Sequence, residues 1–216
     1  MRPMMLVLLV AAMAVLLAGC PQPQTSTSQP PAPERQAPTP LGPGRSLKIA
    51  MIAKSSTNPV FLSARTGAEA AARELSAKHG INITIDWRTP PTEDGQVQAQ
   101  RLTQAANEGA NAILISCSDA GKVTGAINDV VARGVPVMTF DSDAPQSKRF
   151  AYYGVDDLKT GGQVLEELAK LIGGKGKVAI LAGNQNAPNL QKRVQGVMFF
   201  FKQKPAYEII GTFYHP

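Results

Sequence analysis

Three polar residues follow a buried-looking strand near the middle of the chain. Residues 137–145 read VMTFDSDAP, so apolar or β-branched residues lead directly into Asp141, Ser142 and Asp143. An ionised carboxylate accepts several hydrogen bonds, and the hydroxyl groups of a sugar or polyol are donors that can satisfy it. We predict that Asp141 contacts such a ligand and that Asp143 is structural. The alternative is a strand-end turn in which both acids cap the following backbone.

Polar side chains also follow the three preceding strands of the pattern. The segments are 54–61 (KSSTNPVF), 87–94 (WRTPPTED) and 116–119 (SCSD). They are rich in hydroxyls, amides and carboxylates, and they place few fixed cations opposite the acids. This composition favours a neutral, polyhydroxylated ligand over a phosphate. Within the first segment, Asn58 either caps the next helix or points into the cleft, and Phe61 either stacks on a sugar face or packs in the core.

Enzymatic and metal-binding chemistry find little support in the sequence. The chain has no G-x-S-x-G motif, and its serines have no identifiable histidine partner. The run Gly173-Gly-Lys-Gly-Lys177 precedes an expected strand, whereas a phosphate-binding loop follows one. Neither histidine has a metal-ligand pattern around it, and Cys117 is best explained as a small core thiol. We therefore predict a non-enzyme without cofactor or metal.

Strands and helices alternate along the chain, which is typical of an α/β protein with doubly wound parallel sheets. Expected strands cover residues 47–53, 82–87, 112–116, 136–141, 150–154, 177–181 and 209–213. Expected helices cover residues 60–78, 95–108, 120–133, 158–172 and a stretch from about 190. The strand at 150–154 opens a second series of elements, which indicates a second lobe that is incomplete at residue 216. Two interpretations of residues 199–209 stay open: the approach to the last strand, or sequence foreign to the protein.

The first 45 residues differ from the rest in composition. Arg2 precedes an apolar run from Met4 to Leu17, and residues 17–20 read LAGC. This ending resembles the lipobox of bacterial lipoproteins, which implies cleavage before Cys20 and a lipid on its thiol; a non-lipidated signal or an uncleaved anchor is the alternative. The Pro-rich stretch that follows cannot bury enough apolar surface to fold. We expect a lipoprotein signal peptide at 1–19 and a lipidated Cys20 with a tether at 20–45.

From residue 47 to 197 the chain resembles the periplasmic sugar-binding proteins of the ribose-binding type, the type I solute-binding receptors of ABC importers. The resemblance is carried by five motifs in the family's order: 56–61 (STNPVF), Asp94 with Gln98, 134–141 (GVPVMTFD), 153–157 (YGVDD) and 193–196 (RVQG). It implies two similar lobes joined by three crossing strands, with a sugar held between them. The lobes are expected at 46–155 and, in part, at 156–216.

The resemblance also implies a set of ligand contacts. Ribose binders of this family have an arginine at the position of Ser142 and another at that of Gln191, so it implies a sugar or polyol without specifying ribose. The predicted ligand-binding residues are Asn58, Phe61, Asp141, Ser142, Asn189 and Arg193.

We therefore predict a lipid-anchored, extracytoplasmic, monomeric protein that captures a sugar or polyol and delivers it to ABC permease subunits. The alternative is a sensory receptor of the same fold that feeds a chemoreceptor or histidine kinase. A net charge of +6 would suit nucleic acid, but no run of Lys and Arg reaches five, so no nucleic-acid partner is expected.

Overall fold

The computed structural model describes residues 42, 44–203 and 207–214. The predicted signal peptide, Cys20 and most of the tether lie outside the described residues. Among the helices that are described, none combines the length and the apolar character needed to span a membrane.

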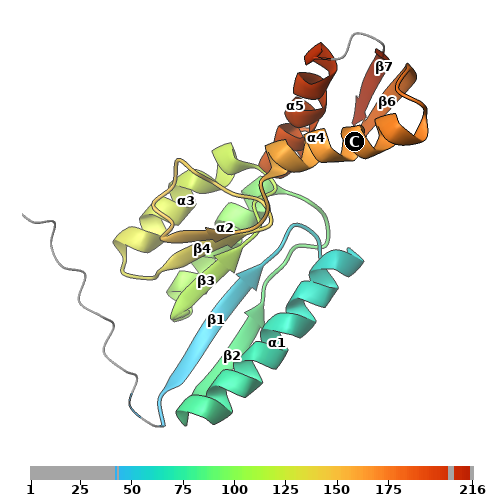
Figure 1. Cartoon of the computed structure of the whole chain (residues 1–216). Helices are drawn as coiled ribbons and strands as arrows, with labels where there is room; N and C mark the ends of the chain where they lie inside the picture. Colours follow the sequence, from blue (N-terminus) through green and yellow to red (C-terminus); the bar gives the residue numbers. More distant parts are fainter. Residues whose placement is uncertain (1–41, 43, 204–206, 215–216) are drawn as a thin grey trace, which may run out of the picture. The chain divides into compact units, whose positions relative to one another are not determined.

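Five parallel strands form the first sheet (Figure 1). They are β1 (Ser46–Ile52), β2 (Asn82–Trp87), β3 (Ala112–Ile115), β4 (Val137–Phe140) and β5 (Ala151–Tyr153), arranged in the order β2-β1-β3-β4-β5. The register pairs Ile52 with Ile115 and Ile115 with Thr139. The carboxyl ends of these strands therefore reach the same edge, where ligands bind in open α/β sheets.

Helices α1 (Pro59–His79), α2 (Gly95–Asn107) and α3 (Ala120–Ala132) follow the first three strands. Each begins after a residue whose side chain accepts hydrogen bonds from the first turn: Asn58, Asp94 and Asp119. The main hydrophobic core lies between α2, α3 and the sheet and includes Ile52, Leu102, Ile113 and Ile127. These boundaries agree with the predicted helices to within one residue.

A second set of elements comprises α4 (Asp157–Leu171), β6 (Gly176–Ala182), α5 (Pro188–Gln203) and β7 (Tyr207–Tyr214). The two strands pair in parallel as a separate sheet. Helices α4 and α5 approach so closely that a Cβ at Gly161 would clash with the Arg193 carbonyl oxygen, and a Cβ at Gly196 with that of Leu158. Glycine at these two positions is what permits the contact.

One boundary of the sequence pattern was wrong. The pattern starts its second series at the strand 150–154, but β5 pairs with β4 in the first sheet. Because a parallel strand can join the edge of either sheet, its local sequence does not reveal its partner. The second series of elements starts at α4. The fold class is confirmed as α/β with parallel sheets.

Candidate functional site

Asp141 has the only positive φ among the non-glycine residues of the described part of the chain, at 57°. Its backbone N–H donates to the Tyr153 carbonyl oxygen over 3.0 Å, and the Tyr152 hydroxyl donates to the Asp141 carbonyl oxygen over 3.0 Å. Strand β5 thus holds Asp141 in a conformation that is unfavourable for a side-chain-bearing residue. Such conformations are maintained by surrounding structure and cluster at binding sites.

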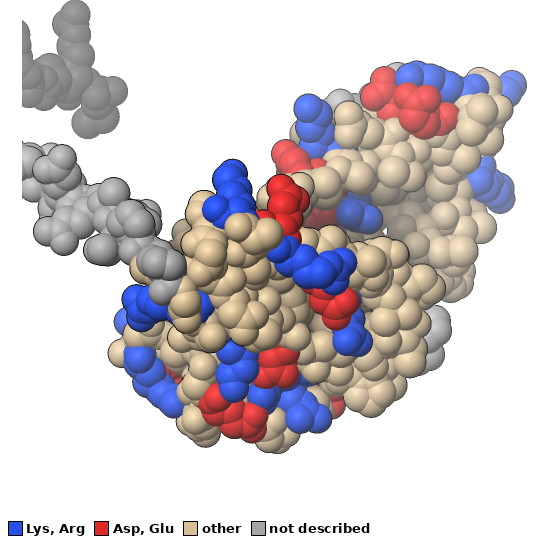
Figure 2. Space-filling model, turned by 90° about the horizontal axis from the view of Figure 1, so that it is seen from below, with Lys and Arg blue, Asp and Glu red and all other residues tan. Residues whose placement is uncertain are grey.

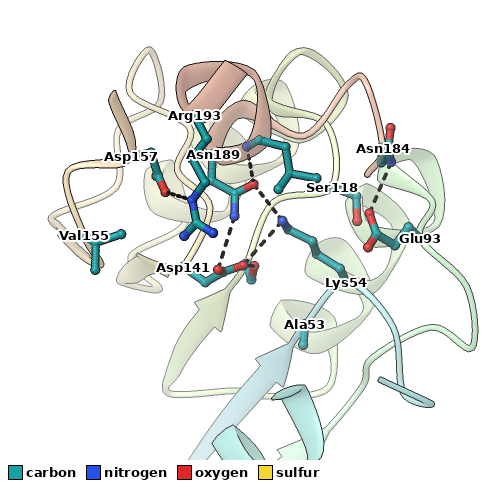
Figure 3. A network of polar contacts seen from close by, with 12 residues as sticks. Ala53, Lys54, Glu93, Ser118, Asp141, Val155, Asp157, Asn184, Asn189 and Arg193 are labelled. Atoms are coloured by element: carbon teal, nitrogen blue, oxygen red, sulfur yellow. Dashed lines mark hydrogen bonds and ion pairs between the residues drawn. The ribbon is translucent and has the colours of Figure 1, made fainter. Parts of the chain in front are cut away.

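The Asp141 carboxylate is the centre of a polar cluster (Figure 3). Its Oδ2 accepts a hydrogen bond from Ser116 Oγ at 2.7 Å and lies 3.4 Å from Lys54 Nζ. Its Oδ1 accepts a hydrogen bond from Asn189 Nδ2 at 3.2 Å. The carboxylate therefore joins side chains that follow β1, β3 and β4 to the start of α5.

Lys54 is a functional candidate that the sequence analysis missed. Its side chain is 4% exposed, and Nζ donates to Asn189 Oδ1 at 2.9 Å in addition to its ion pair with Asp141. Lys54 is thus one of the few fixed cations opposite the acids, and it was not among the predicted ligand-binding residues. Lys54 lies two residues after the end of β1 and Asp141 directly follows β4, and parallel strands bring such positions to one edge. That shared position was the signal available in the sequence.

Asn189 and Arg193 lie one turn apart near the start of α5. Asn189 is buried, and its Oδ1 accepts from the Leu190 N–H as well as from Lys54. Arg193 Nε donates to Asp157 Oδ1 at 2.8 Å, and the Asp157 side chain is 4% exposed. The structure thus brings three predicted residues, Asp141, Asn189 and Arg193, into one region.

Asn58 lines a polar cavity of about 780 Å³ and also caps α1, because its Oδ1 accepts from the Val60 N–H at 3.0 Å. Both roles predicted for it are compatible with this position. The cavity walls come from the loops after β1, β2 and β6. The lining residues are Ser55, Thr57, Asn58, Pro59, Pro91, Thr92, Glu93, Gly183, Asn184 and Asn186.

Phe61 and Ser142 are placed differently. Phe61 is 5% exposed in the first turn of α1, and it is absent from the lining of the polar cavity. Ser142 is fully buried, with its carbonyl oxygen accepting from the Cys117 N–H at 3.0 Å. In the described part of the chain, neither side chain makes a hydrogen bond or ion pair with the Asp141 cluster, and their predicted ligand contacts stay predictions.

Asp143 has a structural environment, in agreement with the sequence analysis. Arg149 binds its carboxylate through Nε and Nη2 at 2.6 and 2.8 Å, and Thr139 Oγ1 donates to it at 2.6 Å. Burial opposes ionisation of Asp143, but the hydrogen bonds from Arg149 and Thr139 outweigh it and lower the pKa of the carboxyl. The Asp143 carboxylate therefore binds Arg149 and Thr139, whereas the Asp141 carboxylate binds Ser116 and Asn189.

The described residues contain three buried polar atoms without a hydrogen-bond partner: Ser118 Oγ, Ser142 Oγ and Gln191 Nε2. Ser118 and Ser142 follow β3 and β4, and Gln191 lies in the first turn of α5. An unsatisfied buried polar group costs about 1–3 kcal/mol. Each of these three side-chain atoms can therefore make a further hydrogen bond, and each lies near the end of β3, the end of β4 or the start of α5.

The family model of the periplasmic binding protein domain matches residues 49–216. The chain belongs to this family. The resemblance stated from the sequence motifs is confirmed, and so is the type I fold that it implies.

Among the relatives of this periplasmic binding protein is the ribose import binding protein RbsB of Bacillus subtilis (strain 168). It is 27% identical over 172 residues, which cover 80% of this chain and 54% of the relative. A solute-binding protein of Burkholderia graminis C4D1M, solved in complex with D-arabinose, has a TM-score of 0.72 at 26% identity, covering 81% of this chain and 58% of that one. The XylFII molecule has a TM-score of 0.71 at 30% identity, covering 81% and 61%. The chain thus spans somewhat more than half the length of these proteins.

Proposed function

We propose that this protein captures a neutral sugar or polyol at the Asp141 cluster and the adjoining polar cavity, and delivers it to an ABC importer. The observation that carries the proposal is the contact of Lys54 and Asp141, from the first sheet, with Asn189 of α5. In the family, ligands are captured between two lobes, and this contact joins residues of both. The proposal includes an extracytoplasmic location and a membrane anchor through lipidated Cys20.

A neutral ligand fits the charge balance of the cluster. Lys54 is paired with Asp141, and Arg193 is paired with Asp157. A net charge on the ligand would have no free counter-charge in these pairs, whereas a hydroxyl group can both donate and accept. Glu93 is the only charged side chain in the lining of the polar cavity. Hydroxyl and amide groups supply most of the remaining polar lining.

Ligand binding without a chemical reaction fits the burial and the raised pKa of the Cys117 thiol, which lies after β3. Cys117 is fully buried at the end of β3, and burial raises the pKa of its thiol to about 12. The thiolate is the nucleophilic form of cysteine. At neutral pH this residue therefore stays a protonated core side chain.

A second candidate function is sugar sensing, in which the loaded protein binds a sensor kinase or a chemoreceptor. It is favoured by the likeness to the XylFII–LytSN complex, at a TM-score of 0.69 and 28% identity, covering 81% of this chain and 60% of that one. Co-purification of the loaded protein with a permease supports import, and co-purification with a kinase supports sensing.

The test of the site is the variant Asp141→Asn. Asparagine keeps the size of the side chain and tolerates the left-handed backbone, but it removes the charge and replaces one of the two acceptor oxygens by an NH2 donor. We expect the dissociation constant of the best sugar, found by a thermal-shift screen of pentoses, hexoses and polyols, to rise about tenfold or more in calorimetry.

Glu208→Gln is the matched control, because it removes a carboxylate whose side chain is 65% exposed in the second sheet. Its affinity should equal that of the wild type. Equal affinity in Asp141→Asn would remove Asp141 from the site, and silence of the wild type across the panel would contradict sugar capture.

A further inference from the structure

Gln98 is a fully buried polar residue of α2 whose side-chain hydrogen bonds all go to backbone beside the site. Its Nε2 donates to the carbonyl oxygens of Ala53 and Ser116 at 3.0 and 2.8 Å. Its Oε1 accepts from the Ser118 N–H at 2.8 Å. Both amide hydrogens and the amide oxygen are therefore engaged.

These backbone groups lie where the pairing of β1 with β3 ends. The ladder runs to Ile52 and Ile115, with a last hydrogen bond from the Ser116 N–H to the Ile52 carbonyl oxygen. Past this point the two segments no longer pair as strands. The Gln98 side chain joins the two segments by its hydrogen bonds to the Ala53 and Ser116 carbonyl oxygens. It thus connects them where the backbone pairing of β1 and β3 has ended.

The bridged residues lead directly to the Asp141 cluster. Ala53 precedes Lys54, whose Nζ pairs with Asp141, and Ser116 places its own Oγ 2.7 Å from the same carboxylate. A hydrogen bond weakens steeply when its geometry is lost. A small displacement of either backbone segment would therefore change the position of a donor to Asp141.

We propose that Gln98 is a positioning residue for the ligand site: it holds the β1 and β3 ends in register and so places Lys54 and Ser116 on Asp141. The inference rests on the proposed function only for its effect on affinity. Its effect on the position of Lys54 can be measured without ligand.

Gln98→Met is the variant for the test, because methionine is flexible and similar in size but makes none of the three hydrogen bonds. Leu102→Val is the matched control: Leu102 lies one turn further along α2, is fully buried and belongs to the hydrophobic core. Both variants disturb the packing of one helix, and only the first disturbs the bridge. Circular dichroism tests whether both variants fold. If Gln98→Met does not fold, Gln98→Asn, which shortens the side chain, replaces it.

The first readout is acetylation of lysines by an amine-reactive ester, followed by mass spectrometry. Lys170, whose side chain is 61% exposed, serves as the reference within each sample, and Lys54 should react far more slowly in the wild type. Loss of the bridge should raise the relative rate at Lys54 about fivefold or more, and Leu102→Val should leave it unchanged. Equal rates at Lys54 in wild type and Gln98→Met would overturn the proposal.

The second readout is the dissociation constant of the best sugar, measured beside the melting temperature. We expect Gln98→Met to weaken binding about tenfold, while Leu102→Val lowers the melting temperature with little change in affinity. Unchanged affinity in Gln98→Met would also overturn the proposal. If no sugar binds the wild type, the proposed function fails, and the acetylation rates still decide the role of Gln98.

Discussion

The two sheets of this protein differ in how their strands are covered. In the first sheet, Ile52, Ile113, Ile115 and Val137 are fully buried against helices. In the second, Val178 is the buried residue of β6, and Leu181 in the same strand is 84% exposed. The elements of the second region are held by the pairing of β6 with β7 and by the close contact of α4 with α5. The same type of secondary structure thus has very different packing in two parts of one chain.

The Asp141 cluster takes residues from both regions. Lys54, Ser116 and Asp141 lie just after strands of the well-packed sheet. Asn189 and Arg193 lie in α5. Segments with few buried apolar contacts open at lower free energy than a core does. We therefore expect the second region to open at lower free energy than the first.

In Figure 2, Lys and Arg residues alternate with Asp and Glu over the face shown. Elsewhere in the structure, charged residues also form ion pairs, such as Arg88 with Asp86 and Arg149 with Asp143. On this face, charge does not separate the two regions in the way that apolar packing does.

The largest expected contrast comes from a matched pair of truncations. Ile113→Ala removes a fully buried side chain and should lower the free energy of unfolding by about 2–5 kcal/mol. Leu181→Ala removes an exposed one and should change it by less than about 0.5 kcal/mol. Chemical denaturation monitored by circular dichroism measures both. Similar losses in the two variants would contradict the difference in packing described here.

A smaller effect is expected where α4 meets α5. Gly161→Ala places a methyl group against the Arg193 carbonyl oxygen, which should cost about 1–3 kcal/mol because the helix backbones must separate. Hydrogen exchange should accelerate in α4, β6 and α5 and stay unchanged in β1 and β3.

Gly162→Ala is the control for that change, because its Cβ would be 3.7 Å from the nearest atom, the Gly196 carbonyl oxygen. It adds the same methyl group at the next position of the same helix without a clash. Alanine is a better helix former than glycine, so this variant should be stabilised by about 0.5–1 kcal/mol. Faster exchange in both variants would mean that helix contact is not what distinguishes position 161.

The smallest expected effect depends on pH and concerns the first region. The pKa of Asp143 is lowered in the folded protein, so this group contributes stability above its unfolded pKa, and the contribution is lost as pH falls through the folded pKa. Arg149→Met should therefore lower the melting temperature at neutral pH, and the difference from wild type should shrink below about pH 4. Thermal melts across this range measure it.

Removal of an ion pair in the second region provides the comparison. Lys177 and Glu208 are 70% and 65% exposed, and exposed pairs contribute about 0–1 kcal/mol. Glu208→Gln should leave the melting temperature nearly unchanged at every pH. A difference between wild type and Arg149→Met that persists unchanged at low pH would show that Asp143 is not the titrating partner.

Much of the fold could be predicted from the sequence because each element carries local signals. Apolar runs specify the strands, and Asn58, Asp94 and Asp119 specify the helix starts. The alternation of strands and helices alone assigned the strand at 150–154 to the second series, because strand pairing depends on distant residues, whereas the lobe expected at 46–155 from the family resemblance includes it. Asp141 and Asn189 could be predicted as neighbours through the family resemblance.

Lys54 and Gln98 could not be assigned their roles in this way. A lysine in a loop is normally solvated. Only the folded arrangement shows that the Asp141 carboxylate and the Asn189 amide compensate for the burial of Lys54. Gln98 acts on backbone atoms of residues far away in the sequence, and side-chain pattern alone does not reveal such contacts. Residue types identify candidates, whereas the connections between them require coordinates.

The left-handed backbone at Asp141 has a consequence for how this protein can diversify. Among amino acids, glycine, asparagine and aspartate adopt that conformation most readily. A mutational library at position 141 should therefore retain few other residues, whatever ligand is used for selection. New specificities would have to arise at neighbours with ordinary backbone geometry, such as Ser116 and Asn189, so this position constrains the evolutionary paths open to the site.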